Sequence, residues 1–541
     1  MTLTSFPFLL FAAVTLLVYY TVPRRGQWVV LLAASTLFYA AAGGWYLPFI
    51  LATILSTYAV ARLMAAHAAK DEAYVAAHKG DLSKDERKAY KAAGKKKRFR
   101  MLVGGLALNF GILAVLKYTG FTVSIVNDVM GLFTETKLSV PSLILPLGIS
   151  FYTFRSTAYI IDVYRGKAQA ATNLGKYALF ISFFPAVMQG PICRYKDLGE
   201  QFETPHAPAW QNLSAGLLRM LWGTFKKLVV ADTLMVAVKT IVAAPEDFGG
   251  MYVLLLIILY SAVIYGDFTG GIDITIGLSR MLGLRLTENF NRPFSSRSTA
   301  EYWNRWHITM GSWFTDYVFY PLSICPSMQR LTKWSRAHLG KAIGMRLPVY
   351  LATLFTWFLT GLWHGASWNF IVWGLLNGVI ILASRECEPL YARFRKKFPR
   401  LTASAFYGGF ASVRTFFLMG AVRILDCYRD VPVTFKAFAT LFYRFDTWRD
   451  LANGSLTERL GLSLPVCVVV ALSTVLIFFV SRTSGATSGA AFDGKETPVA
   501  DRLAERPVLW TLACLGLAVA ILIFGSYGIG FDAGAFIYQT F

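Results

Sequence analysis

Two of the six histidines in this 541-residue chain lie among apolar and aromatic residues. His364 belongs to the run TGLWHGASWNFIVWGLLN (360–377), and His307 belongs to EYWNRWHITMGSWF (301–314). An imidazole ionises near physiological pH, so its neutral form can act as a general base toward an alcohol. A histidine inside an apolar run of membrane length is costly and usually has a partner or a task. Two interpretations follow: catalysis, or a hydrogen-bonded histidine that bridges helices.

The chemistry that these histidines suit is acyl transfer. The sequence contains no GxSxG, GxxxxGK[ST], GxGxxG or HExxH motif, so the common routes to hydrolysis, phosphoryl transfer and dinucleotide binding are not indicated. A buried imidazole could take the proton of an alcohol that attacks a thioester carbonyl, while a second polar group positions the acceptor or stabilises the oxyanion. The catalytic candidates are therefore His364 and His307. The candidates for the lining of a substrate tunnel are Trp363, Asn304, Trp306, Asp267 and Asp316.

Metal chemistry is not indicated by the acidic residues or the cysteines. Asp267 and Asp273 lie in the apolar run YSAVIYGDFTGGIDITIG without an accompanying His or Glu, whereas hard metal ions need several oxygen ligands. We expect Asp267 to pair with a buried arginine or to orient a histidine, because carboxylates inside membranes commonly pair. The six cysteines are widely spaced and form no CxxC motif, so the sequence predicts neither a zinc site nor a disulfide framework.

The composition indicates the kind of protein that positions these residues. With 55% hydrophobic and 16% charged residues, the chain has too little polar surface to cover a soluble core. Apolar runs of about 20 residues recur, and together with shorter segments they predict about 11 membrane spans. The clearest runs are 6–22, 27–42, 46–64, 101–118, 251–265, 347–362, 367–383, 405–425, 462–480 and 508–524.

The net charge of +22 is best interpreted as a topology signal. The segment from Arg62 to Arg100 holds 12 Lys/Arg and 5 Asp/Glu, and a second basic cluster occupies 393–400. The positive-inside rule places residues 65–100 and 393–400 in the cytosol and the N-terminus outside. The Ala-rich segment should be helical, and it either fixes orientation or gathers anionic lipid headgroups or a phosphorylated donor. No soluble region is large enough to predict nucleic-acid binding.

The middle of the chain predicts broken helices. Prolines and polar residues interrupt the apolar runs from Pro141 to Tyr195, and such breaks are tolerated at membrane depth only inside protein or beside water. We expect the stretch 288–322 to contain a re-entrant or interfacial helix, on which Trp303 and His307 would share a face. The expected fold is an all-α polytopic membrane protein, with re-entrant helices around a central funnel or tunnel. Residues 1–541 are expected to form a single domain.

Eight short motifs distributed over the chain indicate more than the fold class. LPLGISFYTF, IDVYRG, SFFPAVMQGPICRY, GDFTGGIDITIG, ENFNRPF, WNRWHITMGSWFTDYVFYPL, GLWHGASWNFIVWGLLNG and the final FIYQTF resemble the membrane-bound O-acyltransferase family. The resemblance is to the bacterial branch with the alginate O-acetylation and teichoic-acid D-alanylation proteins. It implies that His364 is the essential histidine and His307 a supporting one, where a cytosolic and an outer funnel meet. Family members often read DFSGYSD where this chain has DFTGGID (267–273).

The resemblance also implies a reaction. An acetyl thioester, acetyl-CoA, would enter from the cytosolic side of a bacterial cytoplasmic membrane, and no permanently bound cofactor is expected. The acetyl group would pass at His364 to a polysaccharide hydroxyl, or to the serine of an extracytoplasmic SGNH-type partner. The alternatives are D-alanyl transfer to teichoic acid, or a transporter or flippase that uses the same broken helices without covalent chemistry.

Overall fold

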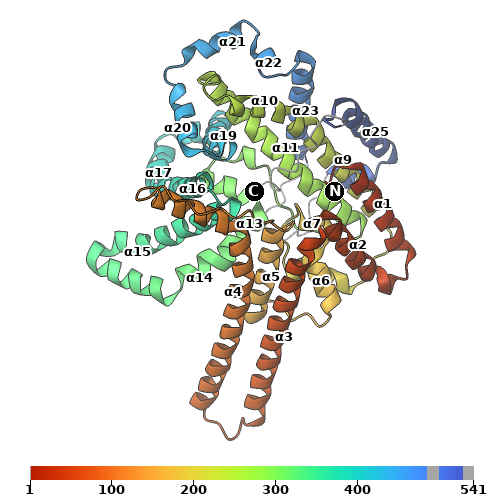
Figure 1. Cartoon of the computed structure of the whole chain (residues 1–541), viewed down its shortest axis with the longest axis vertical. Coiled ribbons are helices and arrows are strands. Elements are labelled where there is room, and N and C mark those ends of the chain that lie inside the picture. Colours follow the sequence, from red (N-terminus) through yellow and green to blue (C-terminus); the bar gives the residue numbers. More distant parts are fainter. Residues whose placement is uncertain (1, 484–498, 528–541) are drawn as a thin grey trace. The chain divides into compact units, whose positions relative to one another are not determined.

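The computed structural model describes residues 2–483 and 499–527, and these residues are organised in helices (Figure 1). Within these ranges, eight helices are long and apolar enough to cross a membrane, and the shorter α1 (Phe6–Thr21) is also apolar. The all-α polytopic fold is therefore confirmed, whereas the count of about 11 spans is not. The FIYQTF motif lies outside the described residues.

The described chain divides into two compact units, and each is described by itself. Unit 1 comprises residues 1–212 and 279–286, and unit 2 comprises 213–278 and 287–541. The main helices of unit 1 are α1, α2 (Gln27–Ala42), α3 (Leu47–Ala77), α4 (Lys84–Met130), α5 (Ile149–Tyr164), α6 (Leu174–Ser182), α7 (Phe184–Val187) and α8 (Tyr195–Leu198). The expectation of a single domain stays a prediction.

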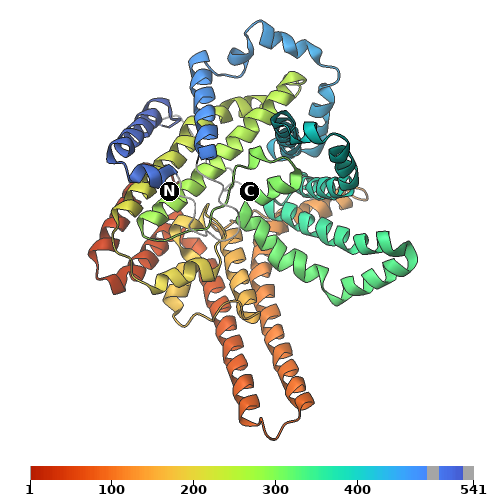
Figure 2. The same cartoon turned by 180° about the vertical axis from the view of Figure 1, so that it is seen from behind.

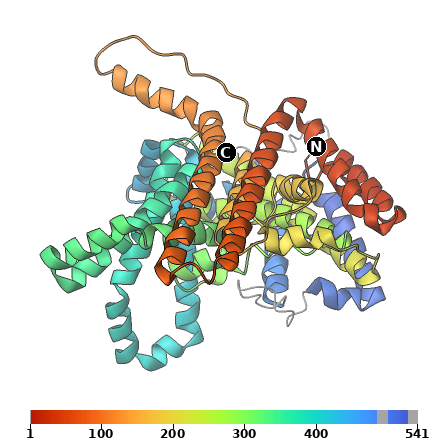
Figure 3. The ribbon, with the colours of Figure 1, turned by 90° about the horizontal axis from the view of Figure 1, so that it is seen from below.

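A long basic hairpin is the most extended part of unit 1. Helices α3 and α4 lie side by side in Figure 1, Figure 2 and Figure 3, and only residues 78–83 interrupt them. Ser83 and Glu86 form a capping box that starts α4, and the rings of Tyr74 and Tyr90 stack with centroids 4.4 Å apart. The basic segment therefore is helical, as its composition predicts.

The proline-rich segment of unit 1 is broken into short helices, as expected. Gly148 precedes α5 in a left-handed conformation with φ +67°, and a Cβ there would lie 2.2 Å from the carbonyl oxygen of Val187. Arg155 is buried and donates hydrogen bonds to the carbonyls of Phe180 (3.1 Å) and Ala186 (2.8 Å). These bonds satisfy backbone groups that a continuous helix would have satisfied itself.

Unit 2 holds both candidate histidines. Its helices before them are α9 (Trp210–Phe225), a π-helical turn (Lys226–Ala231), α10 (Asp232–Ala243) and α11 (Met251–Met281). The next are α12 (Thr299–Arg305), α13 (Ile308–Phe314), a π-helical turn (Thr315–Phe319), α14 (Tyr320–Ser323), α15 (Pro326–His364) and α16 (Trp368–Glu386). The last are α17 (Glu388–Lys397), α18 (Pro399–Ala403), α19 (Ala405–Tyr428), α20 (Val431–Thr440), α21 (Arg449–Ala452), α22 (Leu456–Arg459), α23 (Leu464–Thr483), α24 (Val499–Ala504) and α25 (Pro507–Phe524).

Glycines let α15 and α16 approach each other closely. A Cβ on Gly361 would lie 2.3 Å from the carbonyl oxygen of Phe370, and one on Gly374 would lie 2.4 Å from the carbonyl oxygen of Trp357. Such close backbone contact between small residues is a usual way for membrane helices to associate. Trp373, next to Gly374 on α16, packs against α19 in a core cluster with Val422 and Leu425 and also contacts Trp357 of α15. The end of α15 is thus held firmly.

Candidate active site

His364 is the last residue of α15 and is 7% exposed. The helix ends at Gly365, where a Cβ would lie 2.1 Å from the ring of Phe370. The imidazole lies edge-to-face against Trp373, with centroids 4.6 Å apart, and parallel to Phe370 at 6.4 Å. A short non-helical turn between two tightly packed helices therefore presents this histidine to an aromatic environment.

His307 is completely buried and lies between α12 and α13 rather than within one helix. Its backbone is left-handed, with φ 48° and ψ 52°, and Trp306 before it is extended and bridges Phe290. The prediction of one helix on which Trp303 and His307 share a face is therefore wrong. A left-handed residue with a side chain costs about 1–2 kcal/mol, so other contacts must hold it.

Asn289 supplies those contacts and was not singled out from the sequence. Its Oδ1 accepts hydrogen bonds from the backbone N–H of Thr309 (3.1 Å) and from the Thr309 hydroxyl (2.9 Å), and lies 3.2 Å from His307 Nδ1. Its backbone carbonyl accepts from the N–H of Ile308 at 2.9 Å. The only hint in the sequence was the position of this residue in the motif ENFNRPF.

These bonds determine the tautomer of His307. A backbone N–H can only donate, so the Asn289 atom that faces Thr309 is an oxygen, and His307 Nδ1 must donate to it. The lone pair of the neutral ring is then on Nε2. Burial lowers the pKa of His307, which lies outside the candidate spans, to about 3. His307 is therefore a neutral imidazole that offers a hydrogen-bond acceptor at Nε2.

The two histidines, far apart in the sequence, meet at Trp363. The Trp363 ring centroid lies 4.9 Å from that of His364 and 6.0 Å from that of His307. Phe314, on α13, contacts the same indole at 6.4 Å, and Phe268 contacts His307 edge-to-face at 4.8 Å. The structure thus brings together His364, His307 and Trp363 in one buried aromatic cluster.

The other predicted tunnel residues lie elsewhere or have different partners. Trp306 is buried between Tyr302, stacked at 5.7 Å, and the Arg423 guanidinium, 4.3 Å above its ring. Asn304 is exposed, and Asp316 is half-buried on a π-helical turn. Tunnel roles for these three residues stay predictions.

The carboxylates of α11 pair with cations of the preceding helices. Asp267 Oδ1 lies 2.6 Å from Lys227 Nζ, so the partner that the structure gives this aspartate is a lysine and not the expected arginine. The arginine pairs with the second aspartate, because Asp273 lies 2.9 Å from Arg219 and 2.6 Å from Lys226. The lysine pair could have been noticed in the sequence as KK inside an apolar segment, because charges at membrane depth need partners.

Comparison with known proteins shows which family the sequence of this chain matches. Residues 170–425, which include both histidines, match the model of the membrane-bound O-acyltransferase family. The chain is 31% identical over 403 residues to a probable alginate O-acetylase of Azotobacter vinelandii, covering 74% of each protein. It is 28% identical to a peptidoglycan O-acetyltransferase of Helicobacter pylori, covering 70% of this chain and 67% of that protein. It is 29% identical to a teichoic acid D-alanyltransferase of Bacillus subtilis, covering 50% and 65%.

Proposed function

The chain belongs to the membrane-bound O-acyltransferase family, and from that premise we propose that it moves an acetyl group from acetyl-CoA to an extracytoplasmic polysaccharide. It is a multi-pass membrane protein and an O-acyltransferase. The observation that carries the finer proposal is the cluster of two buried imidazoles on Trp363. Acetyl is preferred because the relatives that match over 70% or more of this chain include two named for O-acetyl transfer.

In the proposed reaction, His364 is the general base. Its imidazole takes the proton of the acceptor hydroxyl while the hydroxyl oxygen attacks the thioester carbonyl carbon. The carbon–sulfur bond breaks, and the thiolate of coenzyme A leaves and takes the proton back from the imidazolium. A new oxygen–carbon ester bond remains on the acceptor, so no other reactant is needed. A base in this position contributes about 10²–10⁴-fold to the rate.

His307 takes a supporting role that its tautomer defines. With Nδ1–H engaged by Asn289, the lone pair on Nε2 can accept a hydrogen bond but cannot donate one to an oxyanion. We therefore assign His307 to holding a second donor group of the acceptor, such as a neighbouring glycan hydroxyl, because the reacting hydroxyl has one proton and gives it to His364. His307 does not stabilise the tetrahedral intermediate. Its low pKa keeps it neutral, so that it does not compete with His364 for the proton.

The membrane arrangement in this proposal follows the basic segments. The α3–α4 hairpin and residues 393–400 lie in the cytosol of a bacterial cytoplasmic membrane, where the donor enters, and the N-terminus lies outside. The acceptor is a glycan hydroxyl, or the serine of an SGNH-type partner that passes the acetyl group on, as the family resemblance suggests. The alternative acyl group is D-alanyl, which the similarity to the Bacillus subtilis teichoic acid D-alanyltransferase favours.

The test is thioester turnover by the purified full-length protein. Release of free coenzyme A from acetyl-CoA, in the presence of a glycan acceptor, should fall about 10²–10⁴-fold in His364→Gln, because an amide cannot take the proton. Thermal stability and membrane insertion should be retained, since the aromatic packing of the helix end remains. An active, well-inserted His364→Gln protein would leave His364 as a structural residue. Absence of turnover in the unmodified protein, with movement of substrate across the membrane, would favour a transporter.

A further inference from the structure

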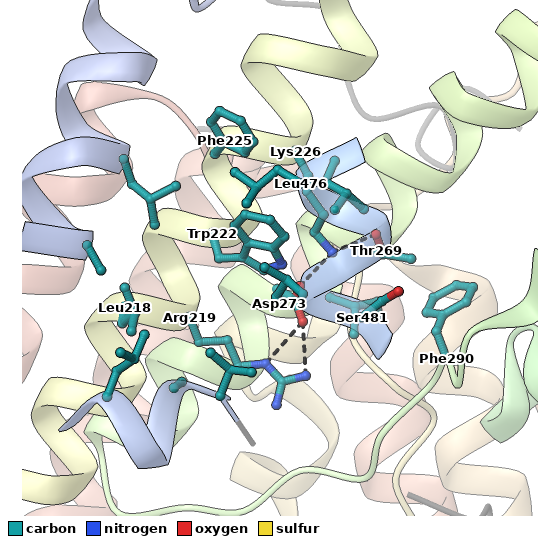
Figure 4. Close-up of a pocket in the computed structure, with 18 of the residues that line it drawn as sticks. Leu218, Arg219, Trp222, Phe225, Lys226, Thr269, Asp273, Phe290, Leu476 and Ser481 are labelled. Atoms are coloured by element: carbon teal, nitrogen blue, oxygen red, sulfur yellow. Dashed lines mark hydrogen bonds and ion pairs between the residues drawn. The ribbon is translucent and has the colours of Figure 1, made fainter. Parts of the chain in front are cut away.

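A cavity of about 510 Å³ lies inside unit 2, separate in its lining from the histidine cluster. Figure 4 shows its charged wall, with Arg219, Lys226 and Asp273 from α9, the π-helical turn after it, and α11. A second, largely apolar part of the lining comes from α23, α24 and α25. The volume is in the range of about 300–1,000 Å³ that is usual for binding sites of small molecules.

Helix α25, which forms part of the apolar wall, is attached by hydrogen bonds near its two ends. At one end, Trp510 Nε1 donates a hydrogen bond to the Ser214 carbonyl at 2.9 Å. At the other, Ser526 N–H donates to the Leu228 carbonyl at 3.0 Å, and its hydroxyl bonds that of Thr233. Between these attachments the cavity is lined by the residues Ala513, Gly516, Leu517 and Ala520, which follow one face of the helix.

The position of this wall points to a hydrocarbon occupant. Both α23 and α25 are candidate membrane spans, and no residue of α25 is buried by the described protein. From α23 the cavity receives Leu476, Ile477 and Val480. A Cβ on Gly516 would meet no atom within 4 Å, so there is open space beside it. Water gains little from such apolar surfaces, whereas an acyl chain at membrane depth fills them without cost.

The charged wall of the cavity contains one more basic side chain than acidic side chains. Arg219 bonds Asp273 and Glu288, with its closest approach at 2.6 Å, and Lys226 lies 2.6 Å from Asp273. Arg292 also lines the cavity, but among the described residues it forms no ion pair, and its buried Nε has no hydrogen-bond acceptor. Two carboxylates therefore face three cations.

Arg292 is also held in place by a strained backbone. Its φ of 49° and ψ of 56° are left-handed, a conformation that side-chain-bearing residues seldom adopt and that often marks a ligand site. The Ser295 N–H donates to the Arg292 carbonyl at 3.1 Å, which stabilises the turn. The turn thus keeps a guanidinium, the side chain best suited to bind a phosphate, at the edge of an apolar cavity.

We propose that this cavity is a binding site for an anionic phospholipid, with its phosphate at Arg292 and an acyl chain along α23 and α25. Each part of such a lipid matches a wall: the phosphate supplies the missing negative charge, and the chain fills the space beside Gly516. The bound lipid would attach the middle of α25 to the helices that carry the Arg219–Asp273 pair. This site is independent of acyl transfer, so its failure would leave the proposed function standing.

The test uses native mass spectrometry of the full-length protein in detergent with added phosphatidylglycerol or phosphatidylcholine. The unmodified protein should retain phosphatidylglycerol. Gly516→Trp, which fills the open space, should lower the retained fraction at least about fivefold. Arg292→Gln should lower the preference for phosphatidylglycerol over phosphatidylcholine by about fivefold, the usual worth of one basic side chain near anionic lipid. Gly409→Trp on α19 is the matched control, since Gly409 also has no atom within 4 Å of its Cβ position.

A second measurement needs no variant. A photoactivatable phosphatidylglycerol, with its reactive group on the acyl chain, should label peptides of α23 or α25 in the unmodified protein. Equal lipid retention by the Gly516→Trp and Gly409→Trp proteins, or labelling confined to other helices, would overturn the proposal. So would equal retention of the two lipids, or displacement of phosphatidylglycerol by inorganic phosphate, which would indicate a site for free phosphate.

Discussion

Replacing Asn289 should lower the rate of acyl transfer, and we expect it to do so through His307, because the Asn289 side chain accepts a hydrogen bond from the His307 ring. In Asn289→Leu, three buried donors lose their acceptor: His307 Nδ1–H, the Thr309 N–H and the Thr309 hydroxyl. Each unsatisfied donor costs about 1–3 kcal/mol, so the melting temperature should fall. The left-handed backbone of His307, which itself costs about 1–2 kcal/mol, loses its support as well.

The effect on the rate can be estimated from one of these bonds. A neutral hydrogen bond contributes about 0.5–1.5 kcal/mol net, and every 1.36 kcal/mol is tenfold in rate. Losing the bond that orients the His307 ring should therefore lower kcat about 2- to 13-fold. KM for acetyl-CoA should change little, because Asn289 is proposed to act through His307 and not through the donor. Asn289→Asp, which keeps an acceptor oxygen, should recover part of the loss.

The assay that isolates this role is a double-mutant cycle. Acetyl transfer is measured for Asn289→Leu, His307→Gln and the double variant. If Asn289 acts through His307, the double variant should be no slower than His307→Gln alone. Solid-state ¹⁵N spectra of labelled histidine should show Nδ1 protonated in the unmodified protein and mixed tautomers in Asn289→Leu. Additive losses in the cycle, or an unchanged tautomer in the variant, would refute the assignment.

Other measurements test the remaining expectations. Because the pKa of His307 is already lowered to about 3, this residue changes charge only far below neutrality, so between pH 5 and 8 His307→Gln should lower the rate without moving the acidic limb of the pH profile. A shifted limb would show that His307 titrates in that range. Cysteines introduced at Gly80 or Lys95, in the basic hairpin, should react only with reagents applied from the cytosolic side; labelling only from outside would reverse the topology. If the hairpin gathers the phosphates of the donor, the apparent affinity for acetyl-CoA should weaken with salt, since exposed charges are screened within about 8–10 Å at physiological ionic strength; a flat response would reduce it to a topology signal. Gly361→Leu should destabilise the protein by about 1–3 kcal/mol or more, because its Cβ would lie 2.3 Å from a backbone oxygen, whereas Gly409→Leu has open space; equal melting temperatures would contradict the close packing of α15 and α16.

The segment DFTGGID (267–273), which differs from the DFSGYSD of many family members, lies on α11. In the segment DFTGGID, Thr269 receives a hydrogen bond from Lys226 at 2.7 Å, and Asp273 pairs with Arg219 and Lys226. Gly270 lies so close to α9 that a Cβ would be 2.7 Å from the Gly223 carbonyl oxygen. The polar residues retained in this segment therefore serve a buried ion-pair network. Gly271 and Ile272 stand at the two positions where family members often have Tyr and Ser.

What the sequence determined by itself was the fold class, the family and the pair of candidate histidines. Hydrophobic runs of membrane length identify membrane helices because every backbone group in lipid must be satisfied within its own helix, which makes this signal local. The helical character of the basic segment could be predicted for a similar reason, from the composition of residues 62–100. The two histidines stood out because a polar ring in an apolar run is costly wherever the chain folds.

The tertiary structure alone decided how these residues meet. The left-handed turn at His307 depends on Asn289, which lies on a separate segment, and local helical periodicity gave no sign that the helix would break there. The lysine partner of Asp267 comes from another helix, and sequence spacing cannot tell Lys227 from an arginine elsewhere. Long-range pairings of this kind are determined by which helices pack together, and that depends on contacts between glycines, rings and charges distributed over the whole chain.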